Sequence, residues 1–292
     1  MKQIRLKAMA KINLGLDVVR KREDGYHEVR MIMQTVNLYD KLFISVSEKP
    51  GIRLKTNLSF LPVNENNLIY KAAKLLIDEF DIKNGVDIQL QKFIPVAAGM
   101  AGGSTDAATT LIGMNQLFDL NLSRRQLMER GVKLGADVPY CVTGGTALSE
   151  GIGEILTRLP DVPKGYVLVA KPGISVSTKF VYTNLKLDQL ESHPDIDAQV
   201  EAIRQQDFGK MAGLMGNVLE TVTIPAYPVI QEIKDLMMKQ GAVNAMMSGS
   251  GPTVFGLFTN QRQAEAACES MKDSGLAKMV FLTTFIGQNP YV

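Results

Sequence analysis

A glycine-rich stretch between a predicted strand and a predicted helix restricts the fold of this chain more than any other feature. It runs from Pro95 to Asp106, with glycines at 99, 102 and 103, and a helical pattern follows from about Ser104. Glycine lets the backbone approach a ligand closely and adopt positive φ angles. The free N–H groups and dipole of a helix N-terminus attract anions. We therefore predict a phosphate-binding loop, although a tight turn without a ligand would show the same spacing.

The loop differs from the two best-known nucleotide-binding motifs. The pattern G-x-x-x-x-G-K-[ST] is absent from the sequence, and these glycines are not spaced as in G-x-G-x-x-G. A P-loop or a dinucleotide-binding fold is therefore not indicated.

The length of 292 residues predicts two domains, placed at residues 1–160 and 161–292, and strand patterns with intervening helix patterns predict an α+β fold. The boundary is placed at the proline-containing stretch 158–164, because an apolar strand follows it. Strands are predicted at 4–19, 41–46, 86–90, 166–170, 253–258 and 279–286. Helices are predicted at 67–80, from 104 onward, 123–135, 196–205, 208–220, 229–240 and 262–272.

Composition limits the class of protein. Of 292 residues, 46% are hydrophobic and 21% are charged, which is typical of a globular chain. The net charge of +2 arises from scattered side chains, so we expect neither nucleic acid nor a membrane as the main partner. Cys141 and Cys268 are expected to be buried free thiols. The first residues do not resemble a signal peptide, and an apolar run of about 18 residues is absent, so we expect a cytoplasmic protein.

Two charged residues are candidates for chemistry. Asp137 is predicted to lie just beyond a helix C-terminus, where the helix dipole disfavours a carboxylate, and such a broken rule often marks a functional position. Lys11 lies in an apolar strand between Ala10 and Ile12. A solvated loop aspartate and an outward-facing lysine are the ordinary alternatives. If the fold brings the two together, the lysine would keep the aspartate ionised and stabilise charge on a phosphoryl oxygen.

Two further segments have more than one interpretation. Tyr26 and His27 follow a turn glycine, where one ring could stack on a base and the other could hydrogen-bond its edge, but ordinary packing explains the pair equally well. The turn at residues 248–252 is either a second phosphate-side loop or a connection.

Taken together, these segments resemble the GHMP kinase superfamily, which includes galactokinase, homoserine kinase and mevalonate kinase. The segments that carry the resemblance are Ala10-Lys-Ile-Asn-Leu-Gly15, Asp24-Gly-Tyr-His-Glu28, Gly102-Gly-Ser-Thr-Asp-Ala-Ala108, Leu134-Gly-Ala-Asp-Val-Pro139, Glu150-Gly-Ile-Gly-Glu154, Pro172-Gly173 and Ser248-Gly-Ser-Gly251. The branch they match phosphorylates the 2-hydroxyl of a cytidine-diphosphate-linked methylerythritol in the non-mevalonate synthesis of isoprenoid precursors. The resemblance thus implies a two-domain fold with ATP and this substrate in the cleft between the domains.

The resemblance also implies roles for individual residues. Asp137 would be the base and Lys11 its neighbour, while Tyr26, His27 and Tyr182 would contact the cytosine and Asn13 the sugar alcohol. The triphosphate would bind the loop formed by Pro95, Val96, Ala97, Ala98, Gly99, Met100, Ala101, Gly102, Gly103, Ser104 and Thr105. The chain departs from the usual pattern at Met100 and Ala101, where leucine and glycine are commoner.

Three points stay open at the level of sequence. Mg²⁺ is expected with ATP, but its ligands are unknown, with Ser104 and Asp106 as weak candidates. A kinase for another alcohol is the nearest alternative, and it would have no need of Tyr26 and His27. A catalytically inactive nucleotide sensor is the other, and it would have no need of both Lys11 and Asp137.

Overall fold

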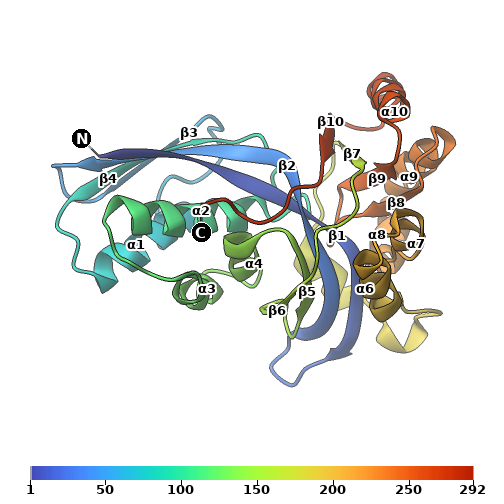
Figure 1. Ribbon diagram of the computed structural model, residues 1–292, viewed down its shortest axis with the longest axis horizontal. Coiled ribbons are helices and arrows are strands. Elements are labelled where there is room, and N and C mark those ends of the chain that lie inside the picture. Colours follow the sequence, from blue (N-terminus) through green and yellow to red (C-terminus); the bar gives the residue numbers. More distant parts are fainter. Residues whose placement is uncertain (1, 292) are drawn as a thin grey trace.

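Two long antiparallel strands run through most of the molecule: β1 (Gln3–Lys21) and β2 (His27–Ser47) (Figure 1). The computed structural model describes residues 2–291. The strand predicted at 4–19 is confirmed, whereas the one predicted at 41–46 is only the end of β2. The earlier part of β2 was missed because its buried run from Met31 to Val36 does not alternate between apolar and polar residues.

The first sheet has six strands, in the order β3–β4–β2–β5–β6 with β1 also paired to β2. Its other strands are β3 (Ile52–Thr56), β4 (Gly85–Gln91), β5 (Thr146–Glu150) and β6 (Ile155–Arg158). Four helices lie together below the part of this sheet formed by β1 to β4 in Figure 1: α1 (Leu68–Glu79), α2 (Gly102–Leu117), α3 (Arg124–Val132) and α4 (Val138–Thr143). The helix α3 begins with a capping box, in which Ser123 and Gln126 are bonded to each other's backbone.

The second sheet has four antiparallel strands in the order β10–β7–β9–β8. They are β7 (Tyr166–Lys171), β8 (Asn244–Met247), β9 (Val254–Phe258) and β10 (Met279–Thr284). The helices of this half are α5 (Thr178–Asn184), α6 (Ile196–Arg204), α7 (Phe208–Gly213), α8 (Glu220–Ala226), α9 (Val229–Lys239) and α10 (Gln261–Asp273), with a 3₁₀ turn at Leu187–Gln189. The predicted α+β class is confirmed.

The single helix predicted over 208–220 is wrong, because tertiary pairing interrupts it. Between α7 and α8 the chain runs beside β1, where the Leu16 N–H donates to the Gly216 carbonyl and the Val218 N–H donates to the Leu16 carbonyl. Backbone groups used in this way are not available to a helix. The segment therefore joins the C-terminal half to the first strand of the N-terminal half.

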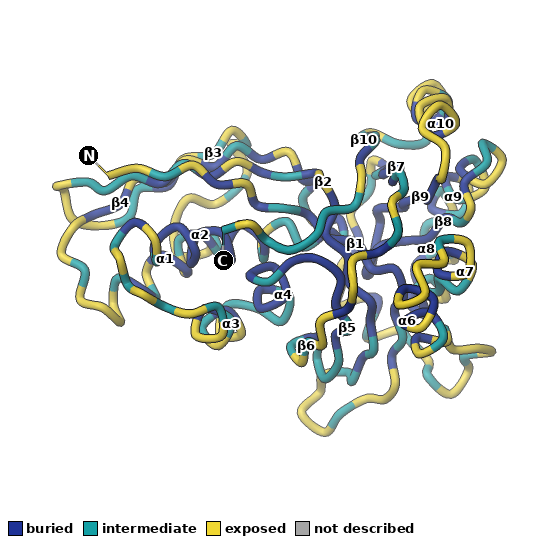
Figure 2. The backbone as a smooth tube through the Cα atoms, viewed as in Figure 1, coloured by how far each residue is buried: buried dark blue, intermediate teal, exposed yellow. Residues whose placement is uncertain are grey.

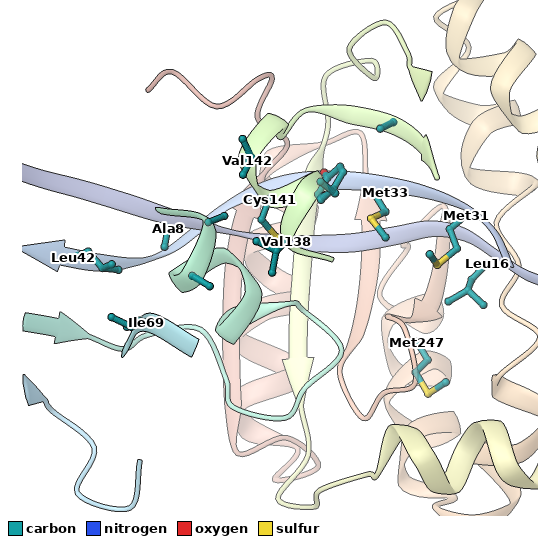
Figure 3. Close-up of a cluster of buried hydrophobic side chains, with 14 of the residues drawn as sticks. Ala8, Leu16, Met31, Met33, Leu42, Ile69, Val138, Cys141, Val142 and Met247 are labelled. Atoms are coloured by element: carbon teal, nitrogen blue, oxygen red, sulfur yellow. The ribbon is translucent and has the colours of Figure 1, made fainter. Parts of the chain in front are cut away.

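Buried hydrophobic side chains continue from one half to the other, and Figure 2 shows buried backbone along the middle of the molecule. One cluster contains Val138 and Cys141 of α4, Met33 of β2 and Met247 of β8 (Figure 3). Cys141 and Cys268 are both buried and free, as predicted. Within residues 2–291, helices long and apolar enough to cross a bilayer are absent.

Candidate active site

A cleft of about 980 Å³ lies where the two halves meet. Its walls come from β1, the segment at residues 25–31, the glycine-rich loop, the start of α4, α5 and the turn at 249–251. These segments lie far apart in the sequence and are brought together by the long β1–β2 pair and by the packing of the two sheets. A cleft of this size accommodates two small ligands or one larger ligand.

The glycine-rich loop ends in the N-terminus of α2, with its free N–H groups turned to the cleft. Gly102, Gly103 and Ser104 form the first turn of α2 and line the cleft. The residue before them, Ala101, is left-handed with φ of 55° and has no side-chain oxygen that could cap the helix. The N–H groups of this turn are therefore available to an anion.

Met100 and Ala101, which depart from the usual pattern of this loop, have a structural explanation. Met100 is only 1% exposed, and its side chain packs in the hydrophobic core. Ala101 takes a conformation that costs an L-residue about 1–2 kcal/mol. Two backbone bonds support it, from the Lys11 N–H to the Met100 carbonyl and from the Thr105 N–H to the Ala101 carbonyl. The loop thus forms an anion-binding turn without glycine at residue 101.

The carbonyl oxygen of Gly99 joins three separate segments. It accepts hydrogen bonds from Lys11 Nζ at 3.2 Å and from Ser248 Oγ at 3.0 Å. Ser248 belongs to the turn that Asn217 also holds, by donating its side-chain amide to the Gly249 carbonyl. The turn at 248–252 is thus packed against the glycine-rich loop, and Gly249, Ser250 and Gly251 line the cleft.

Lys11 and Asp137 lie together in the cleft, so the outward-facing alternative for Lys11 is wrong. The Lys11 side chain is 6% exposed, and its Nζ lies 4.0 Å from Asp137 Oδ2. It also donates to Asn13 Oδ1 at 2.7 Å. The Asp137 side chain is 33% exposed, so it is open to a ligand while facing the buried ammonium.

The predicted backbone setting of Asp137 needs correction. Asp137 follows α3, but it is also the residue that immediately precedes α4. The positive end of the α4 dipole therefore favours its carboxylate. The short helix α4 was not predicted from the sequence, and Pro139 lies in its first turn, where proline is well accommodated.

Tyr26, His27 and Tyr182 also line the cleft. The rings of His27 and Tyr182 are 5.1 Å apart and tilted by 40°. Tyr26 is 61% exposed, so it is free to cover a ligand. Burial, and then the charge of Lys21, lower the pKa of His27, which favours the neutral imidazole with one donor and one acceptor.

Most of the predicted site residues line the cleft, but four residues of the predicted loop do not. Pro95, Val96, Met100 and Thr105 are not part of the cleft lining. The sequence analysis missed Lys21, Thr178 and Lys179, which also line the cleft. Thr178 and Lys179 carry no signal in their spacing, because they begin α5, which only the tertiary fold brings to the cleft, and Lys21 is an ordinary last residue of β1.

Of the two residues considered as magnesium ligands, only Ser104 faces the cleft. Asp106 is buried beneath the loop, where its Oδ2 accepts a hydrogen bond from Lys92 Nζ at 2.7 Å. Clusters of three or more acidic, histidine or cysteine ligands are absent from residues 2–291. The cleft does provide oxygen donors at Ser104 and Asp137. This donor set fits Mg²⁺ that arrives with a nucleotide, because such an ion needs few protein ligands.

Gly99 and Gly103 make a matched pair for testing the loop. Gly99 has φ of 72°, and a Cβ there would overlap the Ser248 carbonyl oxygen. At Gly103 a Cβ would meet only the Leu68 side chain, at 3.5 Å. We expect Gly99→Ala to lower the free energy of unfolding by about 2–4 kcal/mol and Gly103→Ala to change it by about 1 kcal/mol or less. Urea denaturation measures both, and equal losses would contradict this loop geometry.

The fold and the cleft define a class of protein. A two-part α+β fold, an uncapped helix N-terminus after a glycine-rich loop, and a lysine–aspartate pair facing that loop are the features of a small-molecule kinase. The family model described as "GHMP kinases N terminal domain" matches residues 67–145, and the model described as "GHMP kinases C terminal" matches residues 199–276. The chain belongs to the GHMP kinase family, and it is an enzyme that uses ATP.

Particular members of the family are similar over nearly the whole chain. The 4-diphosphocytidyl-2-C-methyl-D-erythritol kinase of Lachnospira eligens is 57% identical, with 97% of this chain and 98% of that protein covered. The kinase of the same name from Lachnoclostridium phytofermentans is 60% identical, with 97% of each chain covered. A crystal structure of a 4-(cytidine 5'-diphospho)-2C-methyl-D-erythritol kinase is 31% identical, with a TM-score of 0.83 over 97% of this chain and all of the other.

Proposed function

We propose that this protein transfers the γ-phosphoryl group of ATP to the 2-hydroxyl of 4-diphosphocytidyl-2-C-methyl-D-erythritol, a step in non-mevalonate isoprenoid-precursor synthesis. The observation that carries the proposal is the identity of 57% and 60% to two kinases named for that acceptor, over 97% of the chain. The cleft supports it, because its lining includes both a phosphate-type loop and three aromatic rings.

In this proposal the chemistry takes place between the loop and Asp137. The acceptor hydroxyl would lie against the Asp137 carboxylate, which takes its proton as the oxygen attacks the γ-phosphorus. Lys11, fixed by Asn13 and the Gly99 carbonyl, lies beside Asp137 and faces the charge that builds on the phosphoryl oxygens. The separation of 4.0 Å between the two side chains and the burial of the lysine support both roles.

The loop and the metal serve the nucleotide in the same proposal. The N–H groups of the first turn of α2 would bind the triphosphate, and the turn at 249–251 would close the other side. Bound Mg²⁺ would offset charge on the β- and γ-phosphate oxygens, with the Ser104 hydroxyl as the available ligand in the loop. A cytoplasmic location, a lack of nucleic-acid partners, and a division into domains at residues 160 and 161 stay predictions.

The aromatic residues of the cleft lining, Tyr26, His27 and Tyr182, predict a preference for cytosine. Stacking on Tyr26 or Tyr182 is worth about 1–3 kcal/mol for any base, so discrimination must come from hydrogen bonds. The neutral His27 beside Tyr182 can provide such a bond. Each neutral group left unpaired by uracil costs about 1–3 kcal/mol, so the cytidine acceptor should have a kcat/KM about 10-fold or more above that of the uridine form.

We expect Tyr26→Ala to raise the acceptor KM without changing the ATP KM, and His27→Ala to reduce the preference for the cytidine acceptor. Equal kcat/KM values for the two acceptors would exclude base recognition.

A panel of acceptors tests the proposed function against its alternatives. ADP release should depend on 4-diphosphocytidyl-2-C-methyl-D-erythritol and stay at the background rate with homoserine or galactose. Turnover of homoserine or galactose alone would assign the chain to another branch of the family. Nucleotide binding without turnover of any acceptor would favour an inactive sensor.

A further inference from the structure

A buried cluster of three charged side chains lies under the glycine-rich loop, outside the cleft itself. Lys92, which follows β4, is 8% exposed, while Asp40 of β2 is fully buried and Asp106 of α2 is 3% exposed. Lys92 Nζ donates to Asp40 Oδ2 and, at 2.7 Å, to Asp106 Oδ2. We refer to Asp40, Lys92 and Asp106 as the charge triad.

The charge triad joins both ends of the glycine-rich loop. At the entrance, Asp40 Oδ1 accepts hydrogen bonds from the backbone N–H groups of Phe93 and Ile94, immediately before Pro95. At the exit, Asp106 lies on α2, in the turn that follows Gly102 to Ser104. One ammonium group therefore connects the strand side of the loop to its helix side.

The position of Lys92 also explains why residue 102 is a glycine. Gly102 lies in α2 and its φ is not in the left-handed region, so conformational freedom is not the reason. A Cβ at this position would lie 2.9 Å from Lys92 Nζ and 3.2 Å from a methyl group of Ile94. The ammonium is thus packed against the residue that begins the anion-binding turn, and any shift of Lys92 would reach that turn.

Stability alone does not explain the charge triad. Removing three charged groups from water is costly, and an apolar cluster of the same size often serves stability as well or better. Asp106 Oδ1 is buried without a hydrogen-bond partner among the described residues. Burial also raises the pKa of Asp106 well above its usual range. The charge triad therefore costs free energy at the place where the two ends of a ligand-binding loop meet. This cost points to a role in shaping that loop.

We propose that Asp40, Lys92 and Asp106 are positioning residues for the nucleotide, holding the two ends of the glycine-rich loop at the separation that ATP phosphates require. This inference rests on the proposed function only in that the loop binds ATP. The acceptor's identity does not enter it.

Two substitutions of Asp106 test the inference, because Lys92 keeps Asp40 as its counter-ion in both. Asp106→Asn retains an oxygen that can accept from Lys92, whereas Asp106→Leu has a similar size and no acceptor. The probe is a non-hydrolysable ATP analogue with Mg²⁺, and its Kd is measured by calorimetry beside the Tm of each variant. Asp106→Leu loses the hydrogen bond from the charged Lys92, so we expect its Kd to be about 10-fold higher than that of wild type. Asp106→Asn keeps a weaker hydrogen bond, so we expect its Kd to be about 3-fold higher.

The control is Arg130→Met. It removes the ion pair between Arg130 of α3 and Glu79 of α1, which is not part of the glycine-rich loop. It should lower Tm and leave the nucleotide Kd within about twofold of wild type. The Kd of 4-diphosphocytidyl-2-C-methyl-D-erythritol should be unchanged in the Asp106 variants. A wild-type nucleotide Kd in folded Asp106→Leu, or equal weakening of both ligands, would overturn the inference. If Asp106→Leu does not fold, a wild-type nucleotide Kd in Asp106→Asn would overturn the inference.

A failure of the proposed function would look different. If the wild-type chain binds the ATP analogue but not the cytidine acceptor, the proposed acceptor is wrong, and the nucleotide measurements still decide the role of the charge triad.

Discussion

Asp137→Asn is expected to lower kcat by about 10²- to 10⁴-fold, because an amide cannot take the proton of the acceptor hydroxyl. The change keeps the size of the side chain at the start of α4, so the fold and both KM values should change little. The 33% exposure of Asp137 and its distance of 4.0 Å from Lys11 Nζ are the observations behind this expectation. Steady-state kinetics with each substrate varied in turn measures the effect.

Asp235→Asn is the control for this experiment. Asp235 is an exposed aspartate on α9, where it accepts a hydrogen bond from Gln231. Its replacement should leave kcat within about twofold of wild type. A near-normal kcat for Asp137→Asn would remove Asp137 from the mechanism.

Lys11→Met is expected to lower kcat by about 10²- to 10³-fold, the size of effect seen when one donor to a developing anion is removed. Methionine keeps an unbranched apolar stem in the buried space, so lost charge is the main change. The same substitution at Lys7 is a close control. Lys7 is exposed on the same strand, with its ammonium 4.3 Å from the ring centre of Tyr39, and its loss should not alter kcat.

The double variant distinguishes a pair from two independent contributions. If Lys11 and Asp137 act as one unit, Lys11→Met with Asp137→Asn should be no more than about tenfold slower than the slower single variant. Losses in kcat that multiply would show that the lysine acts on the nucleotide and not through Asp137.

Much of the fold was predictable because local pattern and tertiary structure agree. The helix predicted at 67–80 is α1, with Asn67 as its N-cap, and the strand predicted at 166–170 is β7. The prediction failed where distant segments decide the outcome. The helix predicted over 208–220 is broken by pairing with Leu16, about 200 residues earlier in the chain.

In the candidate site, too, local signals were predictable and contacts between distant segments were not. The glycine-rich loop was found because glycine and helix signals are local. Whether Lys11 faces the cleft or the solvent depends on which side of β1 the second half covers, and a single strand does not reveal that. The charge triad was missed for the same reason, since Lys92 lies 52 residues from Asp40 and 14 from Asp106.

The most direct test of the account is the identity of the product. The purified chain is incubated with ATP, Mg²⁺ and 4-diphosphocytidyl-2-C-methyl-D-erythritol, and phosphorus NMR locates the new phosphate while ADP is counted. The expected result is one ADP for each acceptor consumed and a single new phosphomonoester on the 2-hydroxyl, both lost in Asp137→Asn. A phosphate on another hydroxyl, or ADP release at the same rate without the acceptor, would contradict it.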